Sequence, residues 1–386
     1  MRTASPYRVG ISGSYGGLNL GDEAILQAIV RELRRRVPVS ILVFGRNPAD
    51  TLARHDVENA VDAQKLSLGE LAEHVRELDL MILGGGGLLF DREADGFLRP
   101  LLVANRLRIP AMTWAVGVGP LHDPESRLVV REALAPVALV TVRDVQSRTV
   151  LEDLGLPQEV RIGADPALLL EPKSIAPEML VREGLEPDER VIGMSVRERG
   201  PAAPDLDPGH YHELLANTVD YVVERMEATV LFVPMERQDR QQIHGVASRV
   251  RNTERVLLLK GDYSPAEIRG LMPRFELAVG MRLHFLIFAA SAGVPFVALP
   301  YGSKVSAFAS MVSMPAIQAT NAGQLLANVD RAWDIRRELR KRLEEAMEHL
   351  RRQASQTADW AVSLLRAGKP RGREHGRISG GMDRTR

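Results

Sequence analysis

The chain has 386 residues, with 50 Lys and Arg against 50 Asp and Glu, and it contains no cysteine. This length exceeds what one hydrophobic core usually supports, so we expect two domains. Balanced charge offers no general attraction for nucleic acid, and the lack of cysteine excludes disulfides, thiolate metal sites and a cysteine nucleophile. No apolar run reaches the ~20 residues that span a bilayer, and the N-terminus lacks the apolar core of a signal peptide, so we expect a cytoplasmic protein.

In the first half, short apolar runs alternate with longer amphipathic segments, a pattern typical of βαβ units on a parallel sheet. The expected strands are Val9–Ser12, Ser40–Phe44, Leu80–Leu83, Ala111–Val116 and Ala138–Val142. The expected helices between them are Glu23–Arg36, Leu68–Glu77 and Pro124–Leu134. Residues 1–172 are therefore predicted to form one Rossmann-like domain.

A proline-containing, charged segment at 168–187 separates this half from a second series of strands. The expected strands are Arg190–Ser195, Thr229–Pro234, Arg255–Leu259, Leu277–Gly280 and Phe296–Leu299. The expected helices are Tyr211–Arg225, Arg237–Val250, Pro265–Met272 and His284–Ala292. Residues 188–325 thus predict a second Rossmann-like domain, and two such domains facing a cleft are typical of nucleotide-sugar glycosyltransferases.

The C-terminal part begins with a long charged helix, expected at 323–366, whose apolar face includes Leu325 and Trp333. We expect the helical segment 326–366 to pack back across the domains. The residues after it, 367–386, are rich in Gly and Arg and poor in apolar residues, so we expect a disordered tail.

The first candidate site is the glycine-rich segment Gly13–Glu23, which leads from the first expected strand into a helix. Glycines permit a tight turn and a close backbone approach, and free amides at the start of a helix favour an anion. Asn19 and Asp22 lie in this segment, and Asp22 suits the N-cap position. The alternative is a loop and helix cap that bind no ligand.

The second candidate site is the run of four glycines Gly84–Gly87, which ends the strand Leu80–Leu83. Such a run costs chain entropy, and it suits a place where backbone approaches a ligand or another segment closely. The carboxyl end of a strand favours a ligand, with Gly85 and Gly86 as the binding residues. The alternative is close packing between the loop and a helix.

The second half contributes candidate residues at the ends of two strands. Arg282, Leu283 and His284 open an apolar helix, where amides, guanidinium and imidazole can converge on a phosphate or carboxylate. Arg197 follows another strand and lies on the same rim if the strands are neighbours, so two arginines would bind a doubly charged anion. The alternative makes Arg282 a salt-bridge partner and His284 a helix-cap residue.

Two further strand ends, Arg143–Ser147 and Gly163–Ala167, carry polar residues, and hydrogen bonding at a domain hinge is favoured over catalysis there. Asp239 is a weaker candidate. No His and Asp cluster has the spacing of metal ligands, so we expect neither a metal nor a cofactor.

Taken in order, these segments resemble the polysaccharide pyruvyl transferase family, in particular its cell-wall-anchoring branch, CsaB. The resemblance covers roughly residues 7–330 and is carried by Gly13–Leu26, Gly84–Asp91, Gly117–Pro120, Arg143–Ser147, Gly163–Pro166, Ser195–Arg197 and Met281–Ala290. It implies a GT-B-like fold and transfer of pyruvate, as a ketal, from phosphoenolpyruvate to two hydroxyls of a sugar. In that branch the acceptor is carried on a polyprenyl lipid, which leaves room for a peripheral contact at the inner face of the cell membrane.

The resemblance also implies that the phosphoenolpyruvate site contains Arg197, Arg282, Leu283 and His284. The two arginines would hold the phosphate and carboxylate of the donor, and His284 would transfer a proton or contact the phosphate. The glycine loops of the first half would then face the sugar acceptor.

The candidate bases for the sugar hydroxyls are Asp22, Glu23 and Asp165, which lie at loop ends. Two alternative functions stay open. One is a nucleotide-sugar glycosyltransferase of the same fold. The other is a catalytically inactive scaffold that binds partners through the helix at 323–366.

Overall fold

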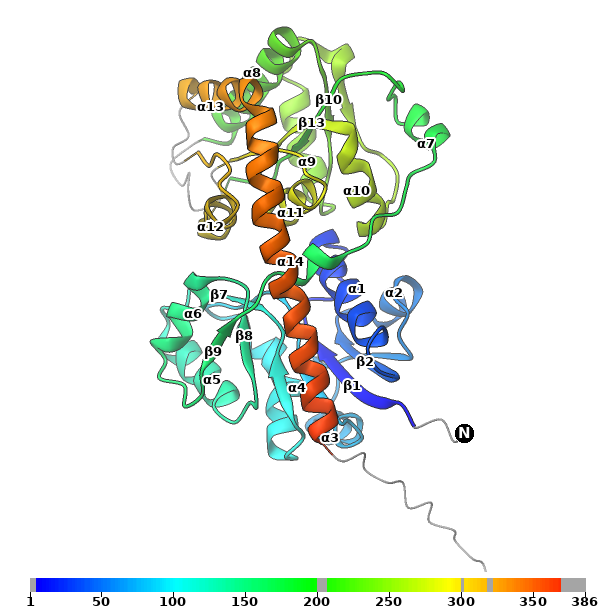
Figure 1. Cartoon of the computed structure of the whole chain (residues 1–386), viewed down its shortest axis with the longest axis vertical. Helices are drawn as coiled ribbons and strands as arrows, with labels where there is room; N and C mark the ends of the chain where they lie inside the picture. The colour runs from blue at the N-terminus through cyan, green and yellow to red at the C-terminus, as the bar shows by residue number, and fades with distance from the viewer. Residues whose placement is uncertain (1–4, 200–206, 300–301, 318–321, 369–386) are drawn as a thin grey trace, which may run out of the picture.

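The computed structural model describes residues 5–199, 207–299, 302–317 and 322–368, and these form two lobes crossed by one long helix (Figure 1). The tail expected at the C-terminus lies outside the described residues from position 369 onward. Within the described ranges, no helix combines the length and apolar content needed to span a membrane.

The N-terminal lobe contains two parallel sheets that share interrupted strands. The first has the order β3-β2-β1-β4-β6, with bounds Tyr7–Ser12 (β1), Val39–Gly45 (β2), Asn59–Asp62 (β3), Leu80–Leu83 (β4) and Ala111–Thr113 (β6). The second has the order β5-β7-β8-β9, with bounds Gly86–Leu89, Val116–Val118, Val140–Val142 and Val160–Ile162. Since β5 follows β4 and β7 follows β6 after short breaks, one sheet continues into the other.

These breaks correct two expectations from the sequence. The four-glycine run is not a single strand-end loop, because only Gly84 and Gly85 separate the strands and Gly86 already begins β5. The strand expected at Ala111–Val116 is also broken. There, Ala115 has a φ of 48°, in the left-handed region that ends a regular strand.

Helices cover both faces of the N-terminal sheet. They are α1 (Leu20–Arg34), α2 (Pro48–Arg54), α3 (Leu68–Arg76), α4 (Ala94–Arg106), α5 (Pro124–Leu134) and α6 (Val145–Glu152). On β4, Leu80 and Ile82 join the core beneath α1, whereas Met81 and Leu83 join the core beneath α3 and α4. This central strand is apolar throughout because neither of its faces meets water.

The C-terminal lobe repeats the parallel topology, in the order β12-β11-β10-β13-β14. Its strands are Val191–Ser195 (β10), Thr229–Phe232 (β11), Val256–Leu258 (β12), Phe275–Gly280 (β13) and Phe296–Ala298 (β14). Its helices are α8 (Pro208–Met226), α9 (Asp239–Ala247), α10 (Pro265–Leu271), α11 (Leu283–Ser291) and α12 (Ser303–Met311). The prediction of two Rossmann-like units is therefore confirmed.

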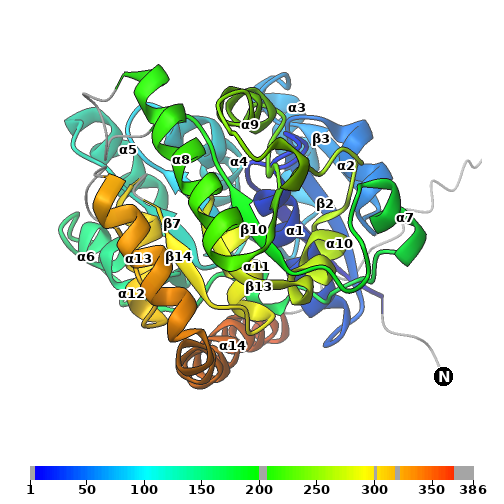
Figure 2. The same ribbon diagram turned by 90° about the horizontal axis from the view of Figure 1, so that it is seen from above.

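The linker and the C-terminal helices connect the lobes. The linker contains a 3-10 helix, η1 (Pro166–Leu169), and the short helix α7 (Pro177–Arg182). The single long helix expected at 323–366 is two helices, α13 (Ala322–Asp334), which lies beside α8 (Figure 2), and α14 (Arg336–Ala367). As expected, α14 packs back across both lobes (Figure 1).

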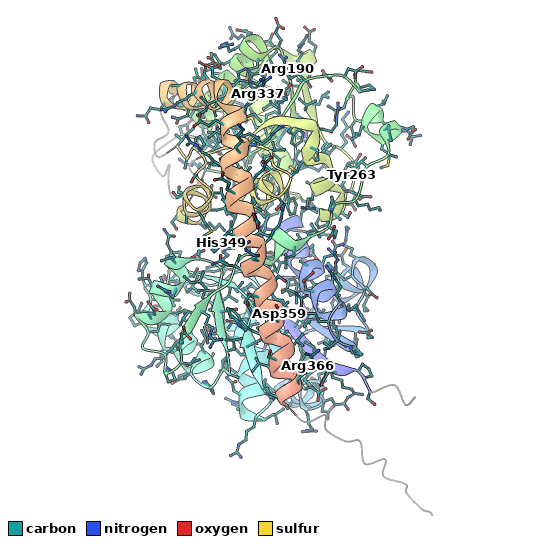
Figure 3. The ribbon with its side chains drawn as sticks, viewed as in Figure 1. Arg190, Tyr263, Arg337, His349, Asp359 and Arg366 are labelled. Atoms are coloured by element: carbon teal, nitrogen blue, oxygen red, sulfur yellow. The ribbon has the colours of Figure 1, made fainter. Side chains whose placement is uncertain are left out.

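The far end of α14 is fixed to the N-terminal lobe by polar contacts. The Arg36 guanidinium donates to Asp359 at 2.9 Å and to the Ser355 hydroxyl at 2.8 Å. The Arg161 guanidinium lies 5.3 Å from the centre of the Trp360 ring. Figure 3 shows Asp359 on the part of α14 that crosses this lobe. The helix thus holds the two walls of the cleft together.

Candidate functional site

The candidate site lies where the two sheets turn their carboxyl ends toward each other. In each Rossmann-like unit the strand order reverses beside the first strand, between β1 and β4 and between β10 and β13, and such a point opens a ligand crevice. A cavity of about 170 Å³ lies here. It is lined by Asn19, Asp22, Gly87 and Arg143 from the N-terminal lobe and by Arg197, Met235, Glu236, Met281, Arg282, Leu283, His284 and Lys304 from the C-terminal lobe. We call it the donor cavity, after the expectation from the sequence that the donor binds beside Arg197, Arg282 and His284.

The start of α1 forms one wall of the donor cavity. Asn19, not Asp22, is the N-cap, because its Oδ1 accepts hydrogen bonds from the amides of Gly21 at 2.9 Å and Asp22 at 3.3 Å. The amide group of Asn19 also donates to Glu236 of the opposite lobe. The Asp22 carboxylate is therefore not used as a cap and lines the cavity.

Asp22 has the electrostatics of a proton-exchanging group. Burial raises the pKa of Asp22 to about 6, although the neighbouring His284 and a hydrogen bond with Ser14 oppose this rise. A carboxyl group with a pKa close to neutral can give or take a proton at working pH. Of the two candidate bases Asp22 and Asp165, Asp22 has the pKa that suits proton exchange.

His284 lies across the lobe boundary, in the first turn of α11. The His284 ring packs closely against Gly21 of the N-terminal lobe, because a Cβ added to Gly21 would lie only 1.9 Å from Nδ1 of His284. Its Nε2 lies 3.6 Å from Oδ2 of Asp165, which is within ion-pair range but too long for a hydrogen bond. Burial favours a neutral Asp165, but His284 and Arg143 outweigh it and lower the pKa of Asp165 to about 2. Asp165 therefore stays ionised beside the Arg143 guanidinium and the His284 imidazole.

Arg282 precedes α11 and is almost fully buried. Its Nε lies 3.1 Å from each carboxylate oxygen of Asp239, and one terminal nitrogen lies 2.7 Å from Oε2 of Glu236. The salt bridge considered as an alternative is thus present, and Asp239 is part of it. The guanidinium still lines the donor cavity together with Arg197, so the structure brings both predicted arginines to one rim.

Arg143 is a cavity residue whose role the sequence interpretation missed. It follows β8, and one terminal nitrogen lies 3.3 Å from Oδ2 of Asp165. A Cβ on Gly117 would lie 2.6 Å from its other terminal nitrogen, and a Cβ on Gly87 would lie 4.0 Å away. Gly117 therefore makes room for this guanidinium, whereas a Cβ at position 87 would be in ordinary contact with it. The sequence favoured a role for this segment in hydrogen bonding at a domain hinge. That role accounts for the contact of Arg143 with Asp165 but not for its place at the cavity wall.

Lys304 is a second residue that the sequence interpretation missed. It lies in the first turn of α12, the helix that follows β14 in the chain, and its exposed side chain faces the donor cavity. Reduced hydration within the cleft, followed by the charges of Arg143 and Arg197, lowers the pKa of Lys304 to about 8. The sequence signal that could have identified Lys304 is the segment Gly302-Ser303-Lys304, which lies at another junction between a strand and a helix.

Several predicted residues lie outside the cavity wall. A Cβ on Gly85 would meet Ile25 at 3.1 Å and Pro166 at 3.2 Å. Close packing therefore explains why position 85 is a glycine, and this is the alternative to ligand binding that the sequence analysis left open. Gly86 has a φ of 99° and lies next to Asp22. Their neighbour Gly87 lines the donor cavity.

The Glu23 carboxylate, a candidate base, has local partners. It accepts from the Gly16 amide at 2.9 Å and lies 2.7 Å from Nε2 of His55. Among the residues that the structure describes, no group of three or more His, Asp or Glu side chains is placed to hold a metal ion. The anion-binding capacity of the site comes from Arg and Lys side chains.

The model of the polysaccharide pyruvyl transferase family matches residues 19–303. The chain belongs to this family. The match includes every residue of the donor cavity except Lys304, and it confirms the family resemblance and a transferase class. The amylovoran biosynthesis protein AmsJ from Erwinia amylovora is 21% identical over 300 residues, which cover 74% of this chain and 72% of AmsJ.

Solved structures share the fold at low sequence identity. The UDP-GlcNAc 2-epimerase from Neisseria meningitidis, bound to UDP-GlcNAc, superposes with a TM-score of 0.61 and 12% identity, covering 94% of this chain and 100% of that chain. The complex of S. aureus MnaA with UDP has a TM-score of 0.66 and 10% identity, covering 94% and 96%. These similarities confirm a GT-B-like fold, and at this identity they establish nothing further.

Proposed function

We propose that this transferase moves pyruvate from phosphoenolpyruvate to a sugar of a cell-wall or exopolysaccharide precursor and releases phosphate. The observation that carries the proposal is the set of four cationic side chains around the donor cavity, Arg143, Arg197, Arg282 and Lys304. Phosphoenolpyruvate presents a phosphate and a carboxylate a few bonds apart, so it needs cations from more than one direction. Membership of the pyruvyl transferase family and the charge of the cavity both support the proposal of such a donor.

The donor is held from both lobes in this proposal. Arginine pairs with phosphate and carboxylate through two parallel hydrogen bonds, whereas lysine acts as a point charge. Arg197 and Arg282 bind the phosphate and carboxylate from the C-terminal lobe, and Lys304 adds a charge to the phosphate. Arg143 approaches from the N-terminal lobe, and Leu283 supplies an apolar contact to the methylene group.

The reaction balances without any further reactant. A proton adds to the methylene carbon of phosphoenolpyruvate, and one sugar hydroxyl attacks the neighbouring carbon and loses its proton. Phosphate then leaves with the electron pair of its C–O bond, and the second hydroxyl attacks the same carbon. Two hydroxyl protons are released, one replacing the proton given to the methylene carbon and the other leaving with phosphate.

Two side chains are placed to move these protons. His284 gives the proton to the methylene carbon or contacts the phosphate, with Asp165 stabilising its cationic form. Asp22 takes a hydroxyl proton from the acceptor, because it lines the same cavity and its raised pKa suits proton exchange. Neither role requires a metal or cofactor.

The acceptor lies on the side of the N-terminal lobe in this proposal. Asn19, Gly85 and Gly86 belong to the loops on that side, with Asn19 at the cavity wall and Gly85 acting through packing. AmsJ is named for amylovoran biosynthesis, which supports an exopolysaccharide precursor. We propose a polyprenyl diphosphate-linked sugar, reached in the cytoplasm at the inner face of the membrane without nucleic acid as a partner.

The test combines phosphate release with mass analysis of candidate lipid-linked acceptors after incubation with phosphoenolpyruvate. We expect phosphate release that depends on the acceptor, and an acceptor whose mass rises by one pyruvate ketal. The variant His284→Gln should lose both signals, whereas His349→Gln, on the exposed surface of α14 (Figure 3), should retain them. Turnover of a nucleotide sugar without any need for phosphoenolpyruvate would instead identify a glycosyltransferase.

A further inference from the structure

The two ends of α11 lie in different surroundings. Its first turn places His284 at the donor cavity, and its last residue, Ser291, lies about 10 Å further along the helix axis. There the Ser291 carbonyl accepts hydrogen bonds from two guanidinium groups, those of Arg269 on α10 and Arg351 on α14. We call Arg269, Ser291 and Arg351 the Ser291 cluster.

The positive charge of the Ser291 cluster is not neutralised by the protein that surrounds it. No described carboxylate lies within ion-pair distance of Arg269 or Arg351. Glu171 of the linker pairs instead with Arg31 of α1, whose guanidinium also donates to the Leu169 carbonyl at 3.2 Å. Burial, followed by the charge of Arg351, lowers the pKa of Arg269 to about 10, and Glu171 only partly opposes this fall. A bound anion would relieve the repulsion between the two arginines.

The Ser291 cluster also contains buried polar groups that lack a partner. Arg269 uses one terminal nitrogen for the Ser291 carbonyl, at 3.4 Å, and its Nε is buried without a hydrogen-bond partner among the described residues. Ser291 is 5% exposed, and its hydroxyl has no partner in the same part of the chain. Buried polar groups are nearly always paired in folded proteins, so these two groups indicate a bound water or ligand. Arg351 is exposed on α14, so an anion can reach the cluster from solvent.

The helices of the Ser291 cluster meet where the two lobes join. In the N-terminal lobe, α1 contacts both α10 and α14, and η1 of the linker contacts α11 and α14. Figure 1 shows α14 passing this junction on its way from one lobe to the other. An anion held by Arg269 and Arg351 would therefore tie α10 of the C-terminal lobe to the helix that crosses both lobes.

We propose that the Ser291 cluster is a second anion site, outside the donor cavity, that binds inorganic phosphate. Guanidinium groups bind phosphate oxygens through parallel, charge-assisted hydrogen bonds. Arg269 and Arg351 hold the phosphate from two helices, and the Ser291 hydroxyl donates to it. The bound phosphate supplies the counter-ion that no described carboxylate provides, and it stabilises the contact between α10 and α14.

Hydrogen exchange of the full chain, read by mass spectrometry with and without inorganic phosphate, tests the proposal. Sodium chloride at the same ionic strength is the reference, because it screens charge without binding as phosphate does. We expect the amides of segments 265–271 and 345–355 to exchange about tenfold more slowly at about ten times the half-saturating phosphate concentration. The protection arises because local opening of α10 or α14 must first release the anion.

Three variants locate the phosphate. Arg351→Gln should remove the protection, because it deletes one of the two guanidinium groups, and its exposed position should leave the fold intact. The matched control is Arg352→Gln, at the next exposed position of α14, where the arginine pairs with Glu348 at 2.7 Å. This control should keep the protection. Lys304→Ala should keep it too, because Lys304 belongs to the donor cavity.

The proposal is overturned if phosphate protects neither segment, if chloride protects them equally, or if Arg351→Gln and Arg352→Gln give the same protection. Loss of the protection in Lys304→Ala would also overturn it, because the phosphate would then act from the donor cavity. The measurement involves no turnover, so its failure leaves the proposed transfer from phosphoenolpyruvate standing.

Discussion

The imidazole of His284 lies against the α-carbon of Gly21, with the ring on one lobe and the glycine on the other. The hypothetical Cβ contact of 1.9 Å leaves no room for any side chain at this glycine. The contact fixes where the ring can lie relative to Asp22, which follows Gly21 in the first turn of α1. Alignment of the two lobes and alignment of the two groups proposed to transfer protons are therefore the same structural requirement.

Gly21→Ala should lower the rate of phosphate release while the protein stays folded. The new methyl group must displace His284 or part the lobes, and misplacement of a reacting group by about 1 Å can cost 100-fold in rate. The matched control is Gly69→Ala, at the equivalent second position of α3, where the nearest atom to a new Cβ is 4.0 Å away. Equal activity of the two variants would contradict a role for the contact.

Asp22→Asn should change how stability depends on pH. The folded pKa of about 6 lies above the ordinary value of 3.8, so the folded state holds more protons than the unfolded state between these pH values. The free energy of unfolding of the native protein should therefore fall by about 3 kcal/mol as pH rises through this window, relative to the variant, whose amide does not titrate. Urea denaturation of both proteins between pH 4 and 7 measures the difference, and parallel curves would refute it.

Asp165→Asn should destabilise the fold at neutral pH. The pKa of Asp165 falls from 3.8 to about 2 on folding, so its stabilising effect is present above pH 3.8 and is lost as pH falls toward 2. At pH 7 we expect a loss of about 2 kcal/mol, because Arg143 loses its buried counter-ion and His284 loses the carboxylate beside it. Asp123→Asn is the control, since it caps α5 and asparagine caps as well as aspartate. A similar unfolding free energy for both variants would show that Asp165 is not needed as a counter-ion.

Lys304→Ala should raise the KM for phosphoenolpyruvate by about tenfold, because one charge-assisted contact to phosphate is lost. Its side chain is exposed, so the fold should be unaffected. In the native enzyme, KM should rise as pH increases through about 8, since the lysine then loses its charge. Steady-state kinetics from pH 6 to 9 measure both effects, with Lys341→Ala on the exposed surface of α14 as control. An unchanged KM in Lys304→Ala would remove this residue from the donor site.

The strands of both lobes could be predicted where an apolar run ends in a glycine or a charged residue, as in Leu80–Leu83. Other elements contradict their local signals. The helix α4 carries Pro100 in its interior, where tertiary burial overrides a residue that normally ends a helix. The short strand Asn59–Asp62 has no apolar run, because it lies at the edge of the sheet.

The site could be predicted in part from the same logic. Arg197, Arg282 and His284 follow strands directly, so their convergence follows from a parallel sheet. Arg143 and Lys304 also follow strands, but their arrival at the same cavity depends on how the lobes face each other. How the lobes face each other is set by α14 and the linker. The sequence indicates both segments, but no local pattern in it gives the arrangement of the lobes that they hold.

The crossing of α14 has a consequence for synthesis on the ribosome. Ala354, Ala358 and Leu365 are buried within the same core as the first strand and α1. The core around β1 and α1 is therefore completed by a helix that is synthesised long after them. Until that helix has left the exit tunnel, an apolar face of the N-terminal lobe stays exposed to water, and the nascent chain is open to aggregation or to chaperones throughout translation.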